Sequence, residues 1–315
     1  MKYSLVFPGQ GAQEVGMGKD LVQCYPSARD VFERSDEALG FGLSRLIFEG
    51  PEEELKKTEY AQPAILAMSI AVLRSLQNEE GLVLNPLYVA GHSLGEYTAL
   101  VAGETLSLED GVRLVNLRGK LMQEAVPLGQ GSMAAVIGLE REKVLAVCDE
   151  ASSMGVCQAA NFNAPGQTVI SGETRAVDRA VELCKDAGAK RALSLKVSAP
   201  FHCSLMRPVA DKLREAFGNC SWKIPKWPLV ANASAEEEND VESIQEALFL
   251  QTFMPVLWSD SVDKMITAGT GAFLEAGPGS VLSGLIKRIS AGAECFSANT
   301  CKNIPAAIDF LKEGQ

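Results

Sequence analysis

The segment between residues 129 and 198 constrains the fold most strongly, because its predicted helices and strands follow one another in a recognisable order. The residue pattern predicts a strand at 133–139, a helix at 140–154, strands at 156–160 and 168–171, a helix at 174–187 and a strand at 191–197. Asn163-Ala164-Pro165-Gly166 is typical of a turn and would join the two middle strands as a hairpin. This βαββαβ order is that of the ferredoxin-like motif, so we expect residues 129–198 to form a small inserted subdomain.

The flanking residues, 1–128 and 199–315, predict one larger α/β body. An apolar run at 3–7 ends at Pro8-Gly9, and a short buried strand at 87–90 ends at Gly91. The other predicted elements are helices at 61–77, 205–217, 241–252 and 280–289, a strand at 272–275 and a solvated polar loop at 234–240. We expect a ligand to bind in the cleft between the two bodies.

Charge and the length of apolar runs exclude two classes of function. Lys and Arg number 29 against 40 Asp and Glu, a formal net charge of −11, and no Lys or Arg block is present to bind nucleic acid. The longest apolar stretches, such as 64–73, are shorter than the roughly 18 to 20 residues of a membrane span. Residues 1–7 are too short for an export signal. We expect a cytoplasmic protein of bacterial type, with a mature organellar protein as the other option.

The cysteines predict neither a metal site nor a disulfide framework. No Cys-x-x-Cys pair occurs, and the chain has only two histidines. We therefore expect no metal and no bound cofactor, and reduced, mostly buried thiols in a reducing compartment. The eight cysteines are at positions 24, 148, 157, 184, 203, 220, 295 and 301.

A candidate nucleophile lies in Gly91-His92-Ser93-Leu94-Gly95, which fits Gly-x-Ser-x-Gly. The pattern follows an apolar strand and precedes a helix-forming run at 96–102, which is the setting of a nucleophile elbow. The glycines allow a sharp turn, and the helix N-terminus supplies a positive field where negative charge develops. Ser93 is the predicted nucleophile; the alternative is a glycine-rich structural turn.

A serine hydroxyl needs a base, and histidine is the usual one. His92 is the immediate neighbour of Ser93, and adjacent side chains in such a turn point in different directions. His202, the only other histidine, is therefore the predicted base. Two alternatives stand beside this one: His202 as a satisfied core residue, and the adjacent Cys203 as a thiol nucleophile, for which the context gives no sign of activation.

Arg118 stands where a charge is not expected. In the predicted helix at 111–126 it falls near the middle of the apolar side, as a step of about 100° per residue shows. A buried guanidinium needs an anionic partner, because burying it unpaired costs several kcal/mol or more. The partner is either a protein acid, in an internal salt bridge, or the carboxylate of a substrate held by the planar guanidinium.

Six motifs, in this order and spacing, resemble the malonyl-CoA:acyl carrier protein transacylase family from about residue 5 to residue 290. They are Phe7-Pro8-Gly9-Gln10-Gly11-Ala12-Gln13, Gly91-His92-Ser93-Leu94-Gly95-Glu96, Arg118, Asn163-Ala164-Pro165-Gly166-Gln167, Ala199-Pro200-Phe201-His202 and Glu275-Ala276-Gly277-Pro278-Gly279. The resemblance implies an α/β-hydrolase-like core with a parallel sheet and a ferredoxin-like insert. The first motif has neither Gly-x-Gly-x-x-Gly nor a P-loop lysine, so it is not a nucleotide-phosphate loop.

The resemblance also implies roles for single residues. Ser93 would accept the acyl group, His202 would act as base and then as acid, and Arg118 would hold the malonyl carboxylate. The backbone N–H groups of Gln10 and Leu94 would form the oxyanion hole, and the main-chain carbonyl of Gln251 would orient His202. The other expected substrate contacts are Phe201, whose ring would leave little room for an alpha-methyl group, Met122 and Asn163.

The implied partners are malonyl-CoA and holo acyl carrier protein. Carrier proteins of this type are acidic, so an enzyme of net charge −11 needs local basic residues to receive one. Those residues would be Lys190, Arg191, Lys196, Lys287 and Arg288, unless they are ordinary surface charges. Three other functions use the same features: a serine thioesterase or hydrolase, a stand-alone polyketide loading acyltransferase, and a non-catalytic carrier-docking module.

Overall fold

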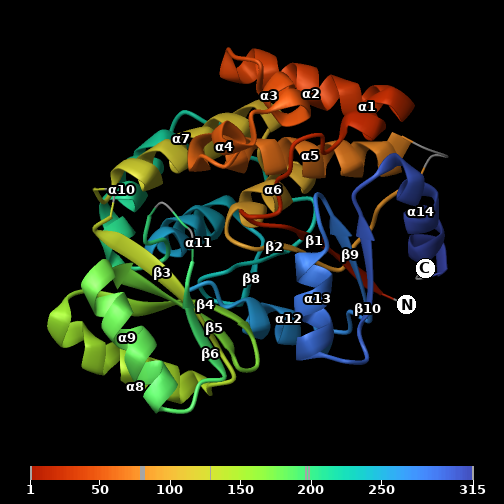
Figure 1. Ribbon diagram of the computed structural model, residues 1–315. Coiled ribbons are helices and arrows are strands. Elements are labelled where there is room, and N and C mark those ends of the chain that lie inside the picture. Colours follow the sequence, from red (N-terminus) through yellow and green to blue (C-terminus); the bar gives the residue numbers. More distant parts are fainter. Residues whose placement is uncertain (1, 79–81, 128, 196, 198, 314–315) are drawn as a thin grey trace.

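A six-stranded sheet runs through the large body, in the order β10-β9-β1-β2-β7-β8 (Figure 1). The computed structural model describes residues 2–78, 82–127, 129–195, 197 and 199–313. Neighbouring strands are parallel except β7 and β8, which are antiparallel. The strands are β1 (Tyr3–Phe7), β2 (Val89–Gly91), β7 (Leu229–Val230), β8 (Glu237–Glu238), β9 (Ala272–Ala276) and β10 (Glu294–Ala298).

Helices cover both faces of this sheet, and the strand sequences explain why. Every residue of β1 and β9 is buried, as expected for parallel strands that pack on both faces. Leu5 and Phe7 pack with α5 (Thr58–Asn78) and α6 (Leu94–Ala102), whereas Val6 packs on the opposite side with α12 (Trp258–Thr267) and α13 (Val281–Ile289). Successive side chains of β1 point to opposite faces of the sheet, so this one strand contributes to two separate apolar clusters.

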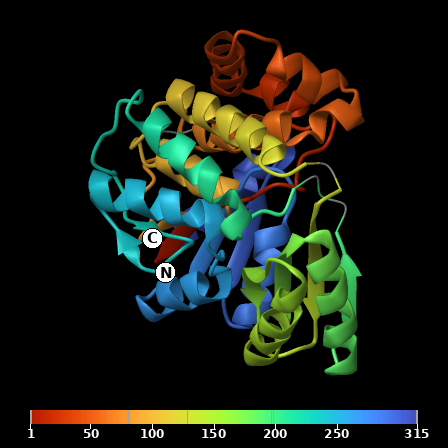
Figure 2. The same cartoon turned by 90° about the vertical axis from the view of Figure 1, so that its left-hand side faces the viewer.

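Most of the remaining helices of the large body form an outer layer, seen above the sheet in Figure 1, whereas α14 lies at the side of the sheet, next to β10; Figure 2 gives a second view. Their bounds are α1 (Lys19–Cys24), α2 (Pro26–Leu39), α3 (Leu43–Glu49), α4 (Glu52–Leu55), α7 (Leu108–Glu124), α10 (Arg207–Phe217), α11 (Val241–Phe253) and α14 (Ile304–Glu313), with short 3₁₀ turns η2 (Ser204–Met206) and η3 (Cys301–Asn303). A further 3₁₀ turn, η1 (Ser152–Met154), belongs to the small body. Most of these helices pack on α5; α10 packs on α7, which carries Arg118, and α11 packs on α10.

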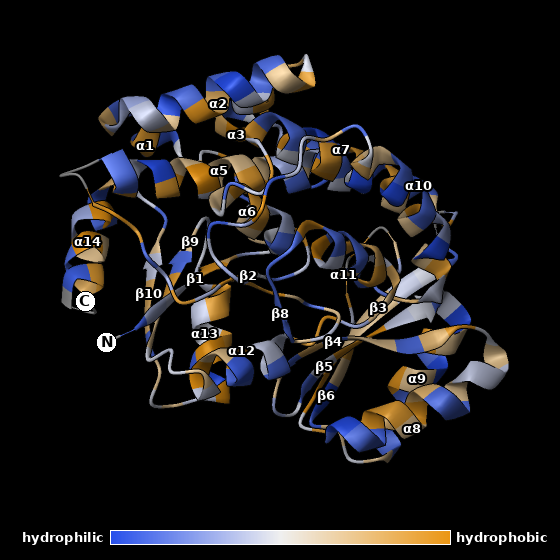
Figure 3. Ribbon diagram, turned by 180° about the vertical axis from the view of Figure 1, so that it is seen from behind, coloured by the Kyte–Doolittle hydropathy of each residue, from blue (hydrophilic) through white to orange (hydrophobic). Residues whose placement is uncertain are grey.

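A second, antiparallel sheet lies beside the large body, with the order β4-β5-β3-β6 (green in Figure 2). Its elements are β3 (Gly131–Ile137), α8 (Arg141–Ala151), β4 (Cys157–Ala164), β5 (Gln167–Glu173), α9 (Thr174–Asp186) and β6 (Arg191–Ser194), in the βαββαβ order predicted from sequence. Both helices pack their apolar residues on one face of the sheet as a separate core, and their mixed polar and apolar character is visible in Figure 3.

Backbone hydrogen bonds join the two bodies. The N–H of Phe162 in β4 donates to the carbonyl of Val256 at 2.9 Å, and the N–H of Val256 donates to the carbonyl of Ala160 at 2.8 Å. On its other face the small sheet contacts Phe201 through Met133, Ala160 and Val169. Among the described residues, no helix is long and apolar enough to cross a membrane.

Two expectations about the large body are wrong. The polar stretch at 234–240 is not loop throughout, because Glu237–Glu238 pairs with Leu229–Val230 as an edge strand. The eight cysteines are not all reduced: Cys24 and Cys301 form a disulfide. They stand at the end of α1 and the start of η3, where the backbone N–H of Cys301 also donates to Asp20 at 2.7 Å.

No local sequence pattern predicts this disulfide, because its cysteines are 277 positions apart. A bond that closes so large a loop raises the free energy of the unfolded chain by roughly 5 kcal/mol, because it lowers the conformational entropy of that chain. The other six cysteines are free thiols, four of them buried, as expected.

Candidate active site

Ser93 occupies a strained turn between β2 and α6. Its φ is 53°, an unusual backbone conformation for a serine. A Cβ on Gly91 would overlap the carbonyl of Gly95, and a Cβ on Gly95 would overlap the carbonyl of Phe7. Only glycine fits either position. The Ser93 N–H donates to Asn232 Oδ1 at 2.7 Å, so a residue from the last third of the chain supports the turn.

His202 is placed to take a proton from Ser93. Its Nε2 lies 2.7 Å from Ser93 Oγ, and its Nδ1 lies 2.8 Å from the backbone oxygen of Gln251. That carbonyl can only accept, so Nδ1 carries the hydrogen and Nε2 accepts from the serine hydroxyl. Burial, assisted by the positive charge of Arg118, lowers the pKa of His202 to about 3. The ring is therefore neutral at physiological pH, as a base must be.

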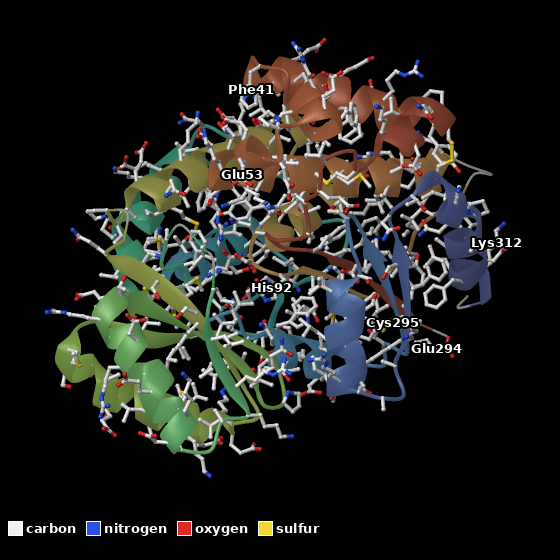
Figure 4. All side chains as sticks on the ribbon, viewed as in Figure 1. Phe41, Glu53, His92, Glu294, Cys295 and Lys312 are labelled. Atoms are coloured by element: carbon white, nitrogen blue, oxygen red, sulfur yellow. A yellow bond between two sulfur atoms is a disulfide. The ribbon has the colours of Figure 1, made fainter. Side chains whose placement is uncertain are left out.

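His92 points away from this pair. Figure 4 shows it near the centre of the molecule, where the small sheet meets the large body. Its Nε2 lies 2.8 Å from Oδ1 of Asn163 in β4. Burial lowers the pKa of His92, so this ring is also neutral. Asn163 thus contacts His92, the residue that precedes Ser93 in the chain.

Arg118 extends from α7 to Ser93 and is 2% exposed. Its Nη1 donates to Gln62 Oε1 at 2.8 Å, and its Nη2 donates to Gln251 Oε1 at 2.9 Å and to Ser93 Oγ at 3.1 Å. The guanidinium also lies 5.4 Å from the centre of the Tyr97 ring. None of the ion pairs found among the described residues includes Arg118. Neutral carboxamides, rather than a protein acid, hold this charge.

Two backbone N–H groups remain available beside Ser93. Leu94 is the first residue of α6, so its N–H has no partner within the helix. No hydrogen bond between described residues uses the backbone N–H of Leu94 or of Gln10. The loop of Gln10 runs close to the elbow, since a Cβ on Gly9 would lie 2.6 Å from the carbonyl oxygen of His92. The side chain of Gln10 is fixed by a 3.2 Å hydrogen bond to Thr58.

The other predicted residues lie next to the residues that contact Ser93. Met122 is buried, with its sulfur 3.9 Å from Gln62 Nε2. Phe201 is half-buried beside His202. Three residues that sequence reasoning missed complete the network: Gln62, Asn232 and Glu96. Gln62 and Asn232 belong to no motif. Glu96 stands within one, but nothing in the sequence indicates that its carboxyl group is buried.

The basic residues expected to receive a partner lie on the surface. Lys190 and Arg191 are exposed at the start of β6, and Lys287 and Arg288 are exposed in the last turn of α13. Arg288 also donates to Gln167 of β5 at 2.8 Å, which links the two bodies. Lys196 lies outside the described residues.

Comparison with known proteins identifies the family of this chain. The family model described as acyl transferase domain matches residues 4–305. A malonyl CoA-acyl carrier protein transacylase of Haemophilus influenzae is 46% identical over 310 residues, which cover 98% of this chain and 99% of that protein. One of Bacillus subtilis is 46% identical over 313 residues, covering 99% and 98%. This chain belongs to the malonyl-CoA:acyl carrier protein transacylase family.

Solved structures of transacylases in this family superimpose closely. An acyl-carrier-protein S-malonyltransferase of Bartonella henselae is 44% identical, with a TM-score of 0.97 over 99% of this chain and all of that one. A malonyl transacylase solved with its holo acyl carrier protein from a type II polyketide system is 44% identical, with a TM-score of 0.95 over 98% of this chain and all of that one. The α/β fold, with one mostly parallel sheet and a second, small antiparallel sheet, is thus a family property.

Proposed function

We propose that this chain transfers the malonyl group of malonyl-CoA to the phosphopantetheine thiol of acyl carrier protein, through a malonyl ester on Ser93. One observation carries the proposal: Arg118 Nη2 lies 3.1 Å from the nucleophilic oxygen and is held by carboxamides instead of an acid. A buried cation at the reacting atom selects an acyl group that ends in a carboxylate. The names of the relatives and the complex with a holo carrier protein support the same substrates.

In the first half-reaction Ser93 Oγ attacks the thioester carbonyl while its proton passes to His202 Nε2. The oxyanion is stabilised by the backbone N–H groups of Gln10 and Leu94. The carbon–sulfur bond then breaks, and the proton on His202 goes to the sulfur, so CoA leaves as a thiol. The malonyl carboxylate stays on Arg118 throughout, which keeps the ester carbonyl beside the oxyanion donors.

The second half-reaction reverses these roles. His202 Nε2 takes the proton of the phosphopantetheine thiol, the sulfur attacks the ester carbonyl, and the carbon–oxygen bond to Ser93 breaks. His202 returns the proton to Ser93 Oγ. The carbonyl of Gln251, 2.8 Å from Nδ1, keeps the ring in the tautomer that both halves need. No oriented Asp is required, because a main-chain carbonyl serves this purpose.

We further propose that the large body is an α/β-hydrolase-like core and that the small one, over residues 129–198, is a ferredoxin-like insert. The strand, strained serine and helix of the elbow support the first assignment. The order β4-β5-β3-β6 with both helices on one face supports the second.

The test is intact-mass spectrometry. Incubation with malonyl-CoA should add the mass of one malonyl group to the chain. This adduct should decay slowly in buffer and disappear on addition of holo acyl carrier protein, which gains the same mass. Rapid loss of the adduct to water would instead show a thioesterase or hydrolase. Comparing malonyl transfer to a carrier protein of fatty acid synthesis with transfer to one of polyketide synthesis identifies the pathway. We propose that the enzyme serves fatty acid synthesis.

Methylmalonyl-CoA should be a poor substrate. Phe201 stands next to the base and is fixed by Met133, Ala160 and Val169 of the small sheet, so its ring cannot move easily to admit an alpha-methyl group. We expect kcat/KM for methylmalonyl-CoA to be at least about tenfold below that for malonyl-CoA, since one misplaced methyl group is worth about 1–3 kcal/mol. Replacing Phe201 with a smaller residue, Phe201→Ser, should narrow the gap. Equal turnover of both substrates by the wild type contradicts this role.

Reversing the charge of the basic surface residues should weaken transfer to the carrier protein alone. In Lys287→Glu/Arg288→Glu and in Lys190→Glu/Arg191→Glu we expect KM for the carrier to rise several-fold, and the effect to shrink in high salt. Formation of the malonyl-enzyme from malonyl-CoA serves as the internal control and should change less. If either double variant transfers the malonyl group to the carrier protein with wild-type kinetics, its two residues do not belong to the docking surface.

A further inference from the structure

Glu96 is a buried carboxyl group that the proposed mechanism does not use. It lies in the first turn of α6, three residues after the nucleophile, and is 0% exposed. Its Oε2 accepts from the backbone N–H of Asn232 at 2.9 Å and from Gln251 Nε2 at 3.2 Å. Its Oε1 is buried and has no hydrogen-bond partner among the described residues. An acidic side chain is seldom buried without a directly paired cation, so its position needs a reason.

The carboxamide of Gln251 connects Glu96 to Arg118. Gln251 Nε2 donates to Glu96 and to the backbone oxygen of Ser93, the latter at 2.8 Å, and Gln251 Oε1 accepts from Arg118. Two of these partners can only accept and the third can only donate, so the carboxamide has one possible orientation. Glu96 and Arg118 are therefore connected through one carboxamide, with Ser93 beside it.

These two groups balance the charge of the buried site. His202 and His92 are neutral, since burial lowers the pKa of both, and burial raises the pKa of Tyr97 on α6 to about 12, so it is neutral too. The other charged group that acts on Glu96 is Glu238 of β8, which raises its pKa, whereas Arg118 lowers it. Burial is the largest effect and raises the pKa of Glu96 to about 7. At neutral pH this carboxyl group can thus gain or lose a proton readily.

A malonyl carboxylate disturbs the balance. It would add a second negative charge to a site with one guanidinium, in surroundings that exclude water. Like charges in such a place raise the pKa of one of them. The malonyl carboxylate would contact Arg118 directly and keep its charge, whereas Glu96, which is one carboxamide away, would lose most of the stabilisation that Arg118 gives it.

We propose that Glu96 takes up a proton from solvent when a malonyl carboxylate occupies Arg118 and releases it when the malonyl group leaves. The inference rests on the proposed function. The bond that forms is between Oε1 and the proton; the bond that breaks is the O–H bond of a hydronium ion in the solvent, and no other bond in the chain changes. Because Oε2 makes both hydrogen bonds, protonation of Oε1 leaves Gln251, and hence Arg118 and His202, in place. Glu96 is a positioning residue of variable charge, which keeps the network intact in both states.

The sign of the pH dependence follows. If a proton is taken up, the malonyl-enzyme is favoured at low pH, and its equilibrium with malonyl-CoA and CoA shifts toward the free enzyme as pH rises above about 7. The limit, for one whole proton, is about tenfold per pH unit. Below the pKa of Glu96 the carboxyl group is already protonated in the free enzyme, and the dependence should vanish.

The test compares the full chain with Glu96→Gln, which keeps an oxygen for Asn232 and Gln251 but cannot be charged. Malonyl-enzyme at a set ratio of malonyl-CoA to CoA is measured by intact mass from pH 6 to pH 9. We expect the ratio of wild-type to Glu96→Gln equilibrium constants to fall several-fold, up to about tenfold, per unit above pH 7. Ionisation of the CoA thiol affects both proteins equally and cancels in this ratio.

The matched control is Glu275→Gln. Glu275 is equally buried, but it accepts from the backbone N–H groups of Leu282 and Ser283 at 3.0 and 2.8 Å, at the start of α13. This variant should follow the wild-type pH profile. Identical profiles for the wild type and Glu96→Gln overturn the proposal, because the proton then goes to another group, such as His202, or is not taken up.

A second measurement does not depend on the variant folding. Mixing wild-type enzyme with malonyl-CoA in weak buffer near pH 7.5, with a pH indicator, should show uptake of a fraction of a proton per malonyl-enzyme formed, after correction for the CoA thiol. No uptake overturns the proposal. A chain that gains no malonyl mass at any pH would instead refute the proposed function, so the two failures are distinct.

Discussion

The variant Ser93→Ala should form no malonyl-enzyme, and its transfer of malonyl groups to carrier protein should fall by a factor on the order of 10⁴ to 10⁶. The reason is that the covalent intermediate needs an oxygen at this position, and the 2.7 Å contact with His202 has no other use. Intact-mass spectrometry after incubation with malonyl-CoA measures the adduct, and a coupled assay of free CoA measures the rate.

Ser75→Ala is the matched control. Ser75 is buried in α5, and its hydroxyl donates to the carbonyl of Ala71 within the same helix at 2.9 Å. This variant should acquire the malonyl group as the wild type does. A malonyl adduct on Ser93→Ala would show that another residue is the nucleophile. Cys203 is the obvious one to examine, although burial raises the pKa of its thiol to about 11, which makes it a poor candidate.

The variant Arg118→Ala should lose malonyl transfer and keep or gain acetyl transfer. Removing one partner of a buried, hydrogen-bonded charge pair costs about 2–5 kcal/mol, so kcat/KM for malonyl-CoA should fall roughly 30- to 4000-fold. Acetyl-CoA has no carboxylate to lose a partner, and the buried charge that disfavours an apolar methyl group is gone. Kinetics with both acyl-CoAs on the same preparation measure the change in selectivity.

Arg118→Gln fills more of the space and controls for the cavity that alanine leaves. It should shift selectivity in the same direction, because it also lacks the positive charge. If both variants lose malonyl and acetyl transfer to the same degree, Arg118 supports the structure around Ser93 and does not recognise the carboxylate.

Ser93, His202 and Arg118 could each be predicted from the sequence, for separate physical reasons. Ser93 follows from a local pattern, since a strained serine between a strand and a helix requires glycines at fixed positions. His202 followed by elimination from two histidines. Arg118 is conspicuous because helical periodicity places a charge among apolar residues. Each of these signals lies within a short stretch of chain.

The network around these residues could not be predicted in the same way. Gln62, Asn232 and the side chain of Gln251 reach the site only through tertiary packing, and no local pattern distinguishes them from other amides. The same holds for β10, whose residues are mostly half-exposed, for the two-residue strand β7, and for the pairing of Cys24 with Cys301. The order of helices and strands in the small body, by contrast, depends on local turns and on hydrophobic periodicity. The predicted order βαββαβ is confirmed.

The distribution of the network along the chain affects how the protein is made. Ser93 and His202, its proposed base, are 109 positions apart, and Gln251, whose carbonyl oxygen contacts the His202 ring, comes 49 positions later still. A nascent polypeptide on the ribosome therefore carries the serine long before it carries the groups that give it reactivity. On the proposed mechanism, the growing chain becomes able to accept an acyl group only after α11 has been synthesised and has packed on α10.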